Sequence, residues 1–248
     1  MRGLIVWILF LALGVVSCRP HRHVTDVVAS GISIDADSLQ MCDSLVSAMI
    51  APYKKQLDSV MGKVLGFADA ELVKELPDGT LGKMIADAAV WYAEGHGKPV
   101  DFAVFNPGGI RIRALSAGPI TRGMIFELMP FDNELVILEM SGEQCMQLFE
   151  AIAKQGGAPV SGLSMTRKDR QPGDVRIGGD PWEPTRTYKM ITTDFLADGG
   201  DGMDFMKNAL TRSALKYKFR DAIADYIEDR TRLNQHLKPI HAGRIRNN

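Results

Sequence analysis

Residues 102–111 read FAVFNPGGIR and join a short apolar run, residues 102–105, directly to a glycine-rich turn. A run of this length that ends in turn residues is typical of a buried β-strand. The paired glycines Gly108 and Gly109 let the backbone approach a ligand closely and expose its N–H groups. Arg111 follows and offers a planar, permanently charged group to a carboxylate or phosphate. Taken alone, the pattern fits a tight turn with a surface arginine equally well.

Helical and strand patterns lie on both sides of this stretch. The sequence Pro77-Asp78-Gly79 predicts a turn, and we expect Thr80 to cap the helix that follows it. We also expect Thr121 to cap a short helix, and Ser141-Gly142-Glu143-Gln144 to open a further helix as a capping box. We expect Pro52 to kink or split the first helix. The apolar spacing predicts helices over residues 37–61, 81–92, 121–128, 141–156 and 214–233, and extended segments over residues 62–72, 135–140, 161–188 and 188–193.

The order of these elements predicts the fold class. Helices and strands are mixed without strict βαβ alternation, and no repeat, low-complexity block or long linker follows residue 35. We therefore predict α+β architecture, with a single mixed α/β layered domain over residues 36–248. Residues 235–248 read as a basic tail.

The composition limits the possible partners. The chain has 248 residues, of which 46% are hydrophobic and 24% charged, with a formal net charge of −1. These fractions are ordinary for a globular protein. Because there is no global positive field, the charge argues against binding of a nucleic acid polymer. One small anionic ligand is still allowed, since it needs only one or two local cations.

The N-terminus resembles an export signal. Arg2 precedes an apolar run, residues 4–16, that is shorter than the roughly 20 residues of a membrane-spanning helix. The run ends in Ser17-Cys18, which resembles a bacterial lipobox, and a plain secretory peptide is the alternative. We expect residues 1–18 to be a lipoprotein signal peptide with lipidation at Cys18, and residues 19–35 to be a tether. The expected location is the bacterial cell envelope, in the periplasm or at the outer membrane, with a lipid anchor.

Cysteine and histidine give no sign of a metal site. Cys42 and Cys145 stand in helical patterns, so two unpaired, buried thiols are expected, although export would permit a disulfide. No CxxC or comparable metal-binding spacing is present. His21-Arg22-His23 falls in the expected tether and is interpreted as spacer. The isolated histidines His96, His236 and His241 are expected at the surface.

Two further loops carry residues suited to ligand binding. Residues 129–133 read MPFDN, in which Phe131 can stack on a ring and Asn133 can hydrogen-bond to its edge. A phenylalanine at such a helix-to-strand junction is, by itself, more often part of the core. Residues 194–202 read DFLADGGDG, which fits a calcium loop, a ribose-binding turn or a plain hairpin. This loop lacks the spacing and the terminal glutamate of an EF-hand.

Together the three loops resemble one family. The order N-x-G-G-I-R, then P-F-x-N, then D-F-x-x-x-G-G-D-G is similar to the C-terminal, substrate-specifying domain of 5'-nucleotidases. The resemblance extends to residues 80–88, 117–121, 138–142, 160–163 and 186–188, so it covers nearly all of the chain after the expected signal.

The resemblance implies a set of ligand contacts. Two phenylalanines of the family enclose the nucleobase, an aspartate accepts from the ribose hydroxyls, and an asparagine reaches the base edge. A glycine after the following helix lines the pocket, and Gly156 is the alternative match for it. The implied substrate-binding residues of this sequence are Arg111, Phe131, Asn133, Gly157, Phe195 and Asp201.

Two departures from the family bear on activity. Complete family enzymes also carry a metallophosphatase domain with D-x-H, G-N-H-[ED] and G-H-x-H motifs, none of which occurs here. Without such a two-metal site the chain is not expected to hydrolyse substrate alone, to contain a cofactor or to have catalytic residues of its own. Family members also supply arginines before the position of Thr80, where this chain has one cation. Either Lys74 or Lys83 substitutes, or the phosphate is handled through another chain.

Three functions fit these observations. The first is the nucleoside- or nucleotide-binding half of a split 5'-nucleotidase in nucleotide catabolism, with a separate metallophosphatase chain that supplies divalent metals. The second is a surface lipoprotein that captures nucleosides for uptake or sensing. The third is a scaffold with a vestigial pocket, against which the joint presence of Phe131, Asn133, Phe195 and Asp201 argues.

Overall fold

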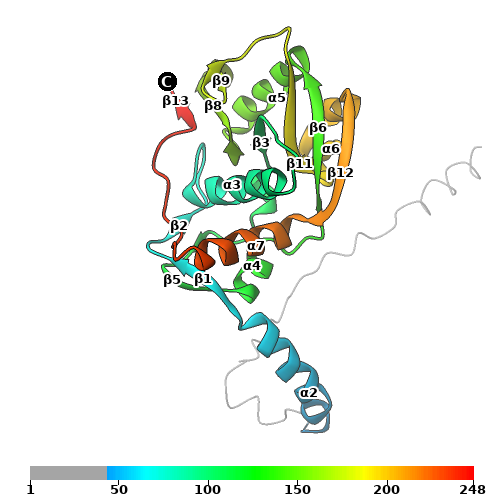
Figure 1. The fold of residues 1–248 in the computed structure, drawn as a ribbon, viewed down its shortest axis with the longest axis vertical. Coiled ribbons are helices and arrows are strands. Elements are labelled where there is room, and N and C mark those ends of the chain that lie inside the picture. Colours follow the sequence, from blue (N-terminus) through cyan, green and yellow to red (C-terminus); the bar gives the residue numbers. More distant parts are fainter. Residues whose placement is uncertain (1–43) are drawn as a thin grey trace, which may run out of the picture. The chain divides into compact units, whose positions relative to one another are not determined.

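The structure is a computed structural model that describes residues 44–248 (Figure 1). The expected signal peptide, the lipidation site Cys18, the tether and Cys42 lie outside the described residues. The chain divides into two units, residues 1–50 and residues 51–248. Helix α2 (Ser44–Met61) contains Pro52 within one continuous helix, so Pro52 does not split it. The fixed φ of proline suits a helix, and its cost is confined to the hydrogen bond it cannot donate and to local crowding.

A five-stranded mixed sheet organises the second unit. Its strand order is β12-β6-β11-β3-β7. Strand β6 pairs antiparallel with both β12 and β11, β11 pairs parallel with β3, and β3 pairs antiparallel with β7. The strands are β12 (Thr211–Lys218), β6 (Glu134–Ser141), β11 (Thr187–Thr193), β3 (Phe102–Val104) and β7 (Val160–Ser161).

Both faces of this sheet are covered. Successive residues of a strand point to opposite faces, and in the central strands both sets of side chains are buried. In β6, Leu135 and Ile137 join one core cluster, whereas Val136 and Leu138 join another. The first cluster contains residues of α3 (Thr80–Gly95) and α7 (Phe219–Arg232), which run side by side in Figure 1. The second contains residues of α5 (Gly142–Gln155) and of a second sheet. The predicted layered α+β fold is confirmed.

The remaining elements are shorter. The second sheet has the order β10-β9-β8-β13, and the pairs β1-β5 and β2-β4 form two small antiparallel ribbons. Their bounds are β10 (Asp180–Pro181), β9 (Gln171–Ile177), β8 (Leu163–Lys168), β13 (Ile245–Asn247), β1 (Val64–Ala68), β5 (Gly118–Thr121), β2 (Leu72–Val73) and β4 (Ala114–Leu115). The short helices are α4 (Arg122–Leu128), α6 (Asp194–Ala197), and the 3₁₀ turns η3 (Pro107–Gly109), η4 (Gly200–Gly202) and η5 (Asp204–Asn208).

Helix starts follow the predicted capping residues in two of three cases. The Thr121 and Ser141 hydroxyls accept from the backbone N–H three residues later, as expected for N-caps. The expected Thr80 cap is wrong. Gly79 is the N-cap of α3, and the Thr80 hydroxyl accepts instead from the backbone N–H of Val73 at 2.8 Å, which ties β2 to the helix.

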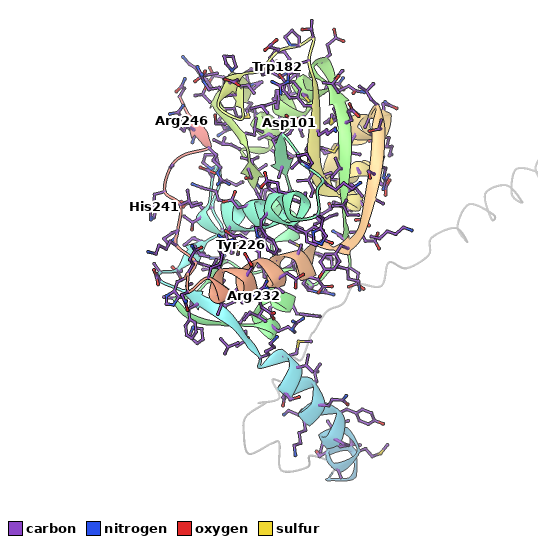
Figure 2. The ribbon with its side chains drawn as sticks, viewed as in Figure 1. Asp101, Trp182, Tyr226, Arg232, His241 and Arg246 are labelled. Atoms are coloured by element: carbon purple, nitrogen blue, oxygen red, sulfur yellow. The ribbon has the colours of Figure 1, made fainter. Side chains whose placement is uncertain are left out.

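The predictions for the C-terminal region were wrong in two places. Residues 214–218, expected as helix, belong to β12, because pairing with β6 outweighs the weak helical spacing there. Lys216 has a φ of 51° at an irregularity in that pairing, and α7 begins only at Phe219. The expected basic tail is partly ordered, since β13 pairs parallel with β8. His241 and Arg246 mark this segment in Figure 2.

Two predictions about side chains can be compared directly with the structure. Cys145 is a free thiol and is fully buried, as expected. His96, His236 and His241 are exposed, as expected. None of the helices within residues 44–248 is both long and apolar enough to span a membrane.

Candidate functional site

Three loops meet at one edge of the central sheet. Strands β3 and β11 are parallel, so their carboxyl ends lie at the same edge, and antiparallel β6 begins there. The loops after β3, before β6 and after β11 therefore converge on one hollow of about 310 Å³. It is lined by Asn106, Gly108, Gly109, Arg111, Phe131, Asn133, Phe195 and Asp201. The structure thus brings together five of the six predicted site residues.

The loop after β3 places a polar pair at the base of this hollow. Asn106 donates from Nδ2 to the Oδ2 of Asp201, which lies 95 residues later, at 2.6 Å. A Cβ at Gly109 would lie 3.2 Å from the Asn106 Oδ1, so glycine leaves room for this pair. The sequence prediction missed Asn106, although it stands directly between the strand and the paired glycines. Its amide holds the Asp201 carboxylate through one oxygen.

Phe131 and Phe195 are exposed at the hollow, with 39% and 42% of their surface accessible. Core phenylalanines such as Phe105 are about 1% exposed. The Arg111 guanidinium carbon lies 5.7 Å from the centre of the Phe131 ring, which is within cation–π range. Arg111 Nη1 also donates to the carbonyl of Gly108 at 3.5 Å. Both rings are therefore available to a planar ligand, and Arg111 lies beside one of them.

The loop after β11 has a backbone that only particular residues can adopt. Gly199 has a φ of 89° and Asp201 a φ of 53°, both in the left-handed region. A Cβ at Gly200 would lie 2.5 Å from the Phe195 ring, so a glycine there lets the ring pack against the turn. Gln155 Nε2 at the end of α5 donates to the Asp201 carbonyl at 3.0 Å. The turn thereby holds Phe195 and Asp201 in fixed relation.

Gly157, the sixth predicted residue, does not line this hollow. Its φ is 132°, and a Cβ there would lie 2.3 Å from the carbonyl oxygen of Pro77. The structure therefore gives Gly157 a packing role against the turn before α3. Gly156, the alternative, is the left-handed C-cap of α5. The residue from this helix end that contacts the hollow's wall is Gln155.

Neither expected substitute cation reaches the hollow. Lys83 has 3% of its side chain exposed and forms an ion pair with Asp78 at 2.9 Å. It also donates to the carbonyl of Ala242 at 3.0 Å, so it is bound within the protein. Lys74 donates to the carbonyl of Ile110 at 2.8 Å and supports the glycine loop from behind. Arg111 is the cation among the residues that line the hollow.

A second hollow of about 480 Å³ adjoins the first and shares Phe195 and Asn133 with it. Asp194 and Asp198 add carboxylates to its wall. Asp198 is held by Arg212 through two hydrogen bonds, which lower the pKa of that carboxyl below its usual range. Phe195 therefore separates two open spaces.

Another hollow, of about 560 Å³, lies away from these loops, between α3, α7 and residues 234–240. Tyr226 contributes to its wall and is labelled in Figure 2. Its polar groups are largely paired with one another, for example His236 with Asp69 at 2.6 Å. Among residues 44–248, no three His, Cys, Asp or Glu side chains are grouped so that they could hold a metal ion.

Fold and geometry together define a layered α+β domain whose candidate ligand hollow lies where strands end, a placement common for ligand sites. More particularly, the chain belongs to the family described as 5'-nucleotidase, C-terminal domain, which matches residues 60–208. The family predicted from the three loops is therefore confirmed.

Relatives support this assignment. Protein UshA of Escherichia coli K12 is 32% identical over 179 residues, which cover 70% of this chain and 31% of UshA. The 5'-nucleotidase of Vibrio cholerae is 28% identical over 170 residues, which cover 64% of this chain and 30% of that protein. The chain thus spans about a third of the length of these relatives.

A solved structure shows the same arrangement. The 5'-nucleotidase precursor from Thermus thermophilus superposes with a TM-score of 0.71 at 25% identity. The superposition covers 83% of this chain and 43% of that protein.

Proposed function

We propose that this domain binds the nucleoside part of a nucleotide in the hollow between the three loops. The observation that carries the proposal is the placement of Phe131, Phe195, Asn133 and Asp201 around one hollow of about 310 Å³. Exposed apolar side chains grouped together and rimmed by polar residues can mark a ligand-binding groove, and a nucleobase offers a flat face that can stack on these two rings.

Each lining residue has a chemically apt role. A base stacked on Phe131 and Phe195 gains about 1–3 kcal/mol per ring, with little dependence on which base it is. The Asn133 amide can donate to and accept from the base edge, and Asp201 can accept from a ribose hydroxyl. Arg111 attracts the anionic part of the ligand.

We further propose that hydrolysis depends on a metallophosphatase on a separate chain, which supplies the divalent metals. The support is the resemblance to 5'-nucleotidases, in which a domain of this kind works beside a metallophosphatase domain that holds two metal ions. Holding the base and ribose while the 5'-phosphate projects toward the metals would raise the rate through proximity.

The proposed location is the bacterial cell envelope, with a lipid on Cys18. The support is the apolar run of residues 4–16 followed by Ser17-Cys18. In a bacterial host fed a labelled fatty acid, the chain should become labelled and the Cys18→Ser variant should not. Equal labelling of both would exclude this anchor.

Ligand-observed NMR tests the binding proposal directly. Residues 19–248 are mixed with adenosine, AMP or uridine at millimolar concentration, which detects even weak binding. We expect saturation transfer to the base protons, and we expect its loss in Phe195→Ala. Absence of transfer for all three ligands would overturn nucleoside binding by this chain alone.

A second measurement separates the split enzyme from a surface protein that captures nucleosides. We expect a metal-dependent phosphatase from the same envelope to co-purify with the chain and to hydrolyse AMP faster when the chain is present. Nucleoside binding without any such partner or rate increase would favour capture instead.

A further inference from the structure

The first turn of α7 contacts the loop of residues 129–133, here called the aromatic loop, through Arg220, whose side chain is 8% exposed. Its Nη1 donates to the carbonyls of Met129 and Phe131 at 3.4 and 3.3 Å. Its Nη2 donates to the Asp132 Oδ1 at 2.7 Å. The guanidinium carbon also lies 4.0 Å from the centre of the Phe126 ring. One buried cation thus contacts both the carboxylate and the backbone of the loop that presents Phe131.

The preceding residue, Phe219, contacts two of the segments that form the hollow, the loop before β6 and the end of β3. Its backbone N–H donates to the carbonyl of Asn133 at 2.9 Å. Its ring stacks on Phe105 with centroids 4.1 Å apart and planes 19° apart. Phe105 directly precedes Asn106, so the same turn supports the end of β3 as well.

Phe131 receives a weaker contact at its ring, from the Arg111 side chain, which is itself exposed. Its ring is 39% exposed, and the loop around it forms no part of a helix or strand between α4 and β6. The order of this loop therefore depends on the groups that hold its backbone. A binding group that is fixed before the ligand arrives loses less conformational entropy on binding.

We propose that Arg220 is a positioning residue, which fixes Phe131 and Asn133 in place for stacking on a ligand ring. Arg220 lies outside residues 60–208, the part of the chain that the family match covers. A guanidinium suits this role because its planar fork can serve several acceptors at once, whereas an ammonium is a point charge. The consequence for the ligand rests on the nucleoside site proposed above.

The neighbouring Lys218 provides a matched control. It pairs with the other Asp132 oxygen at 3.0 Å, but its side chain is 42% exposed. Ion pairs between exposed side chains contribute little to the stability of a fold. Lys218→Gln therefore removes one positive charge from the same carboxylate and leaves the buried backbone contacts intact. A loss of affinity that both substitutions cause is electrostatic. A loss that only substitution of Arg220 causes is due to its buried contacts with the loop backbone.

The first test is a mutant cycle on adenosine affinity. We expect Arg220→Met to weaken adenosine binding about tenfold, Arg220→Lys to weaken it less, and Lys218→Gln to leave it unchanged. In a Phe131→Ala background, Arg220→Met should weaken binding by clearly less than tenfold, because the part of its effect that acts through Phe131 is already lost and only the part that acts through Asn133 remains. A full tenfold loss in both backgrounds, or an equal loss from Lys218→Gln, would overturn the positioning role.

The second test needs no ligand. With 4-fluorophenylalanine at position 131, the fluorine NMR line of the otherwise unmodified chain should be narrow and single, and should stay so in Lys218→Gln. In Arg220→Lys, which retains the charge, it should shift and broaden. An unchanged line in Arg220→Lys would overturn positioning. If the parent chain binds no adenosine while the line responds as expected, the nucleoside proposal fails and the positioning role stands.

Discussion

Phe195 shows at the scale of one residue how an exposed ring is kept in a defined place. Gly200 leaves the space that the ring occupies, and the Thr193 hydroxyl caps the short helix α6 that carries it. Because the ring is 42% exposed, we expect Phe195→Ala to weaken nucleoside binding about tenfold or more, from the loss of stacking. Titration calorimetry or NMR with adenosine measures this change.

The thermal midpoint separates a ligand-facing ring from a core ring. Phe195→Ala should change it by a few degrees at most. The matched control is Phe149→Ala, at a phenylalanine with 0% exposure, which should cost about 3–5 kcal/mol. If Phe195→Ala destabilised the protein as much as Phe149→Ala, Phe195 would be a core residue and the binding assignment would be lost.

At the scale of an element, α5 depends on reciprocal hydrogen bonds at its start. The Ser141 Oγ accepts from the Gln144 N–H at 3.2 Å, and the Gln144 Oε1 accepts from the Ser141 N–H at 3.0 Å. We expect Ser141→Ala to lower the free energy of unfolding by about 1 kcal/mol, as measured by urea denaturation. Ser59→Ala, in the exposed helix α2, is the control and should change it by less than about 0.5 kcal/mol. Equal effects would show that the cap contributes nothing.

Local patterns explain which elements could be predicted. The caps at Thr121 and Ser141 and the buried strand β6 depend on residues close in sequence, and they were predicted. Strand β12 depends on pairing with β6, some seventy residues away, which no local spacing reveals. For the same reason residues 214–218 were interpreted as helix.

In the site, too, the features that depend on residues close in sequence could be predicted, and those that depend on distant residues could not. The loops that carry Phe131 and Phe195 could be found by resemblance, because each is a short motif. The hydrogen bond between Asn106 and Asp201 spans 95 residues, and the contacts of Arg220 with the aromatic loop span about as many. Such contacts depend on how the strand ends converge, and this convergence is known only from the folded chain.

At the scale of the whole molecule, the C-terminal segment joins separate layers. Arg244 forms an ion pair with Asp87 of α3 at 2.8 Å and donates to the carbonyl of Val160 in β7 at 2.6 Å. Its backbone N–H donates to Asp78, the partner of buried Lys83. The segment that the sequence presented as a tail therefore closes a polar network between helix and sheet.

Cysteine and tyrosine side chains that are buried or half-buried should set the alkaline limit of stability for the folded chain. Burial raises the pKa of the Cys145 thiol to about 12. Burial, and then a hydrogen bond to Asp225 at 2.5 Å, raise the pKa of Tyr217 above its usual range. Tyr92 and Tyr226 also have a raised pKa, chiefly through burial. The folded state keeps protons that the unfolded state releases, so stability should fall as pH rises above about 9–10.

Tyr217→Phe tests this alkaline limit. The variant loses the hydrogen bond to Asp225, so it should be less stable than the parent at pH 7 by about 1 kcal/mol. It also lacks the group whose ionisation favours unfolding, so its thermal midpoint should fall less than the parent's between pH 7 and pH 10.5. Tyr53→Phe, at a tyrosine that is 75% exposed, is the control and should follow the parent at both pH values. Parallel pH curves for Tyr217→Phe and the parent would show that the Tyr217 proton does not limit stability, and Cys145, Tyr92 and Tyr226 would have to account for the alkaline loss.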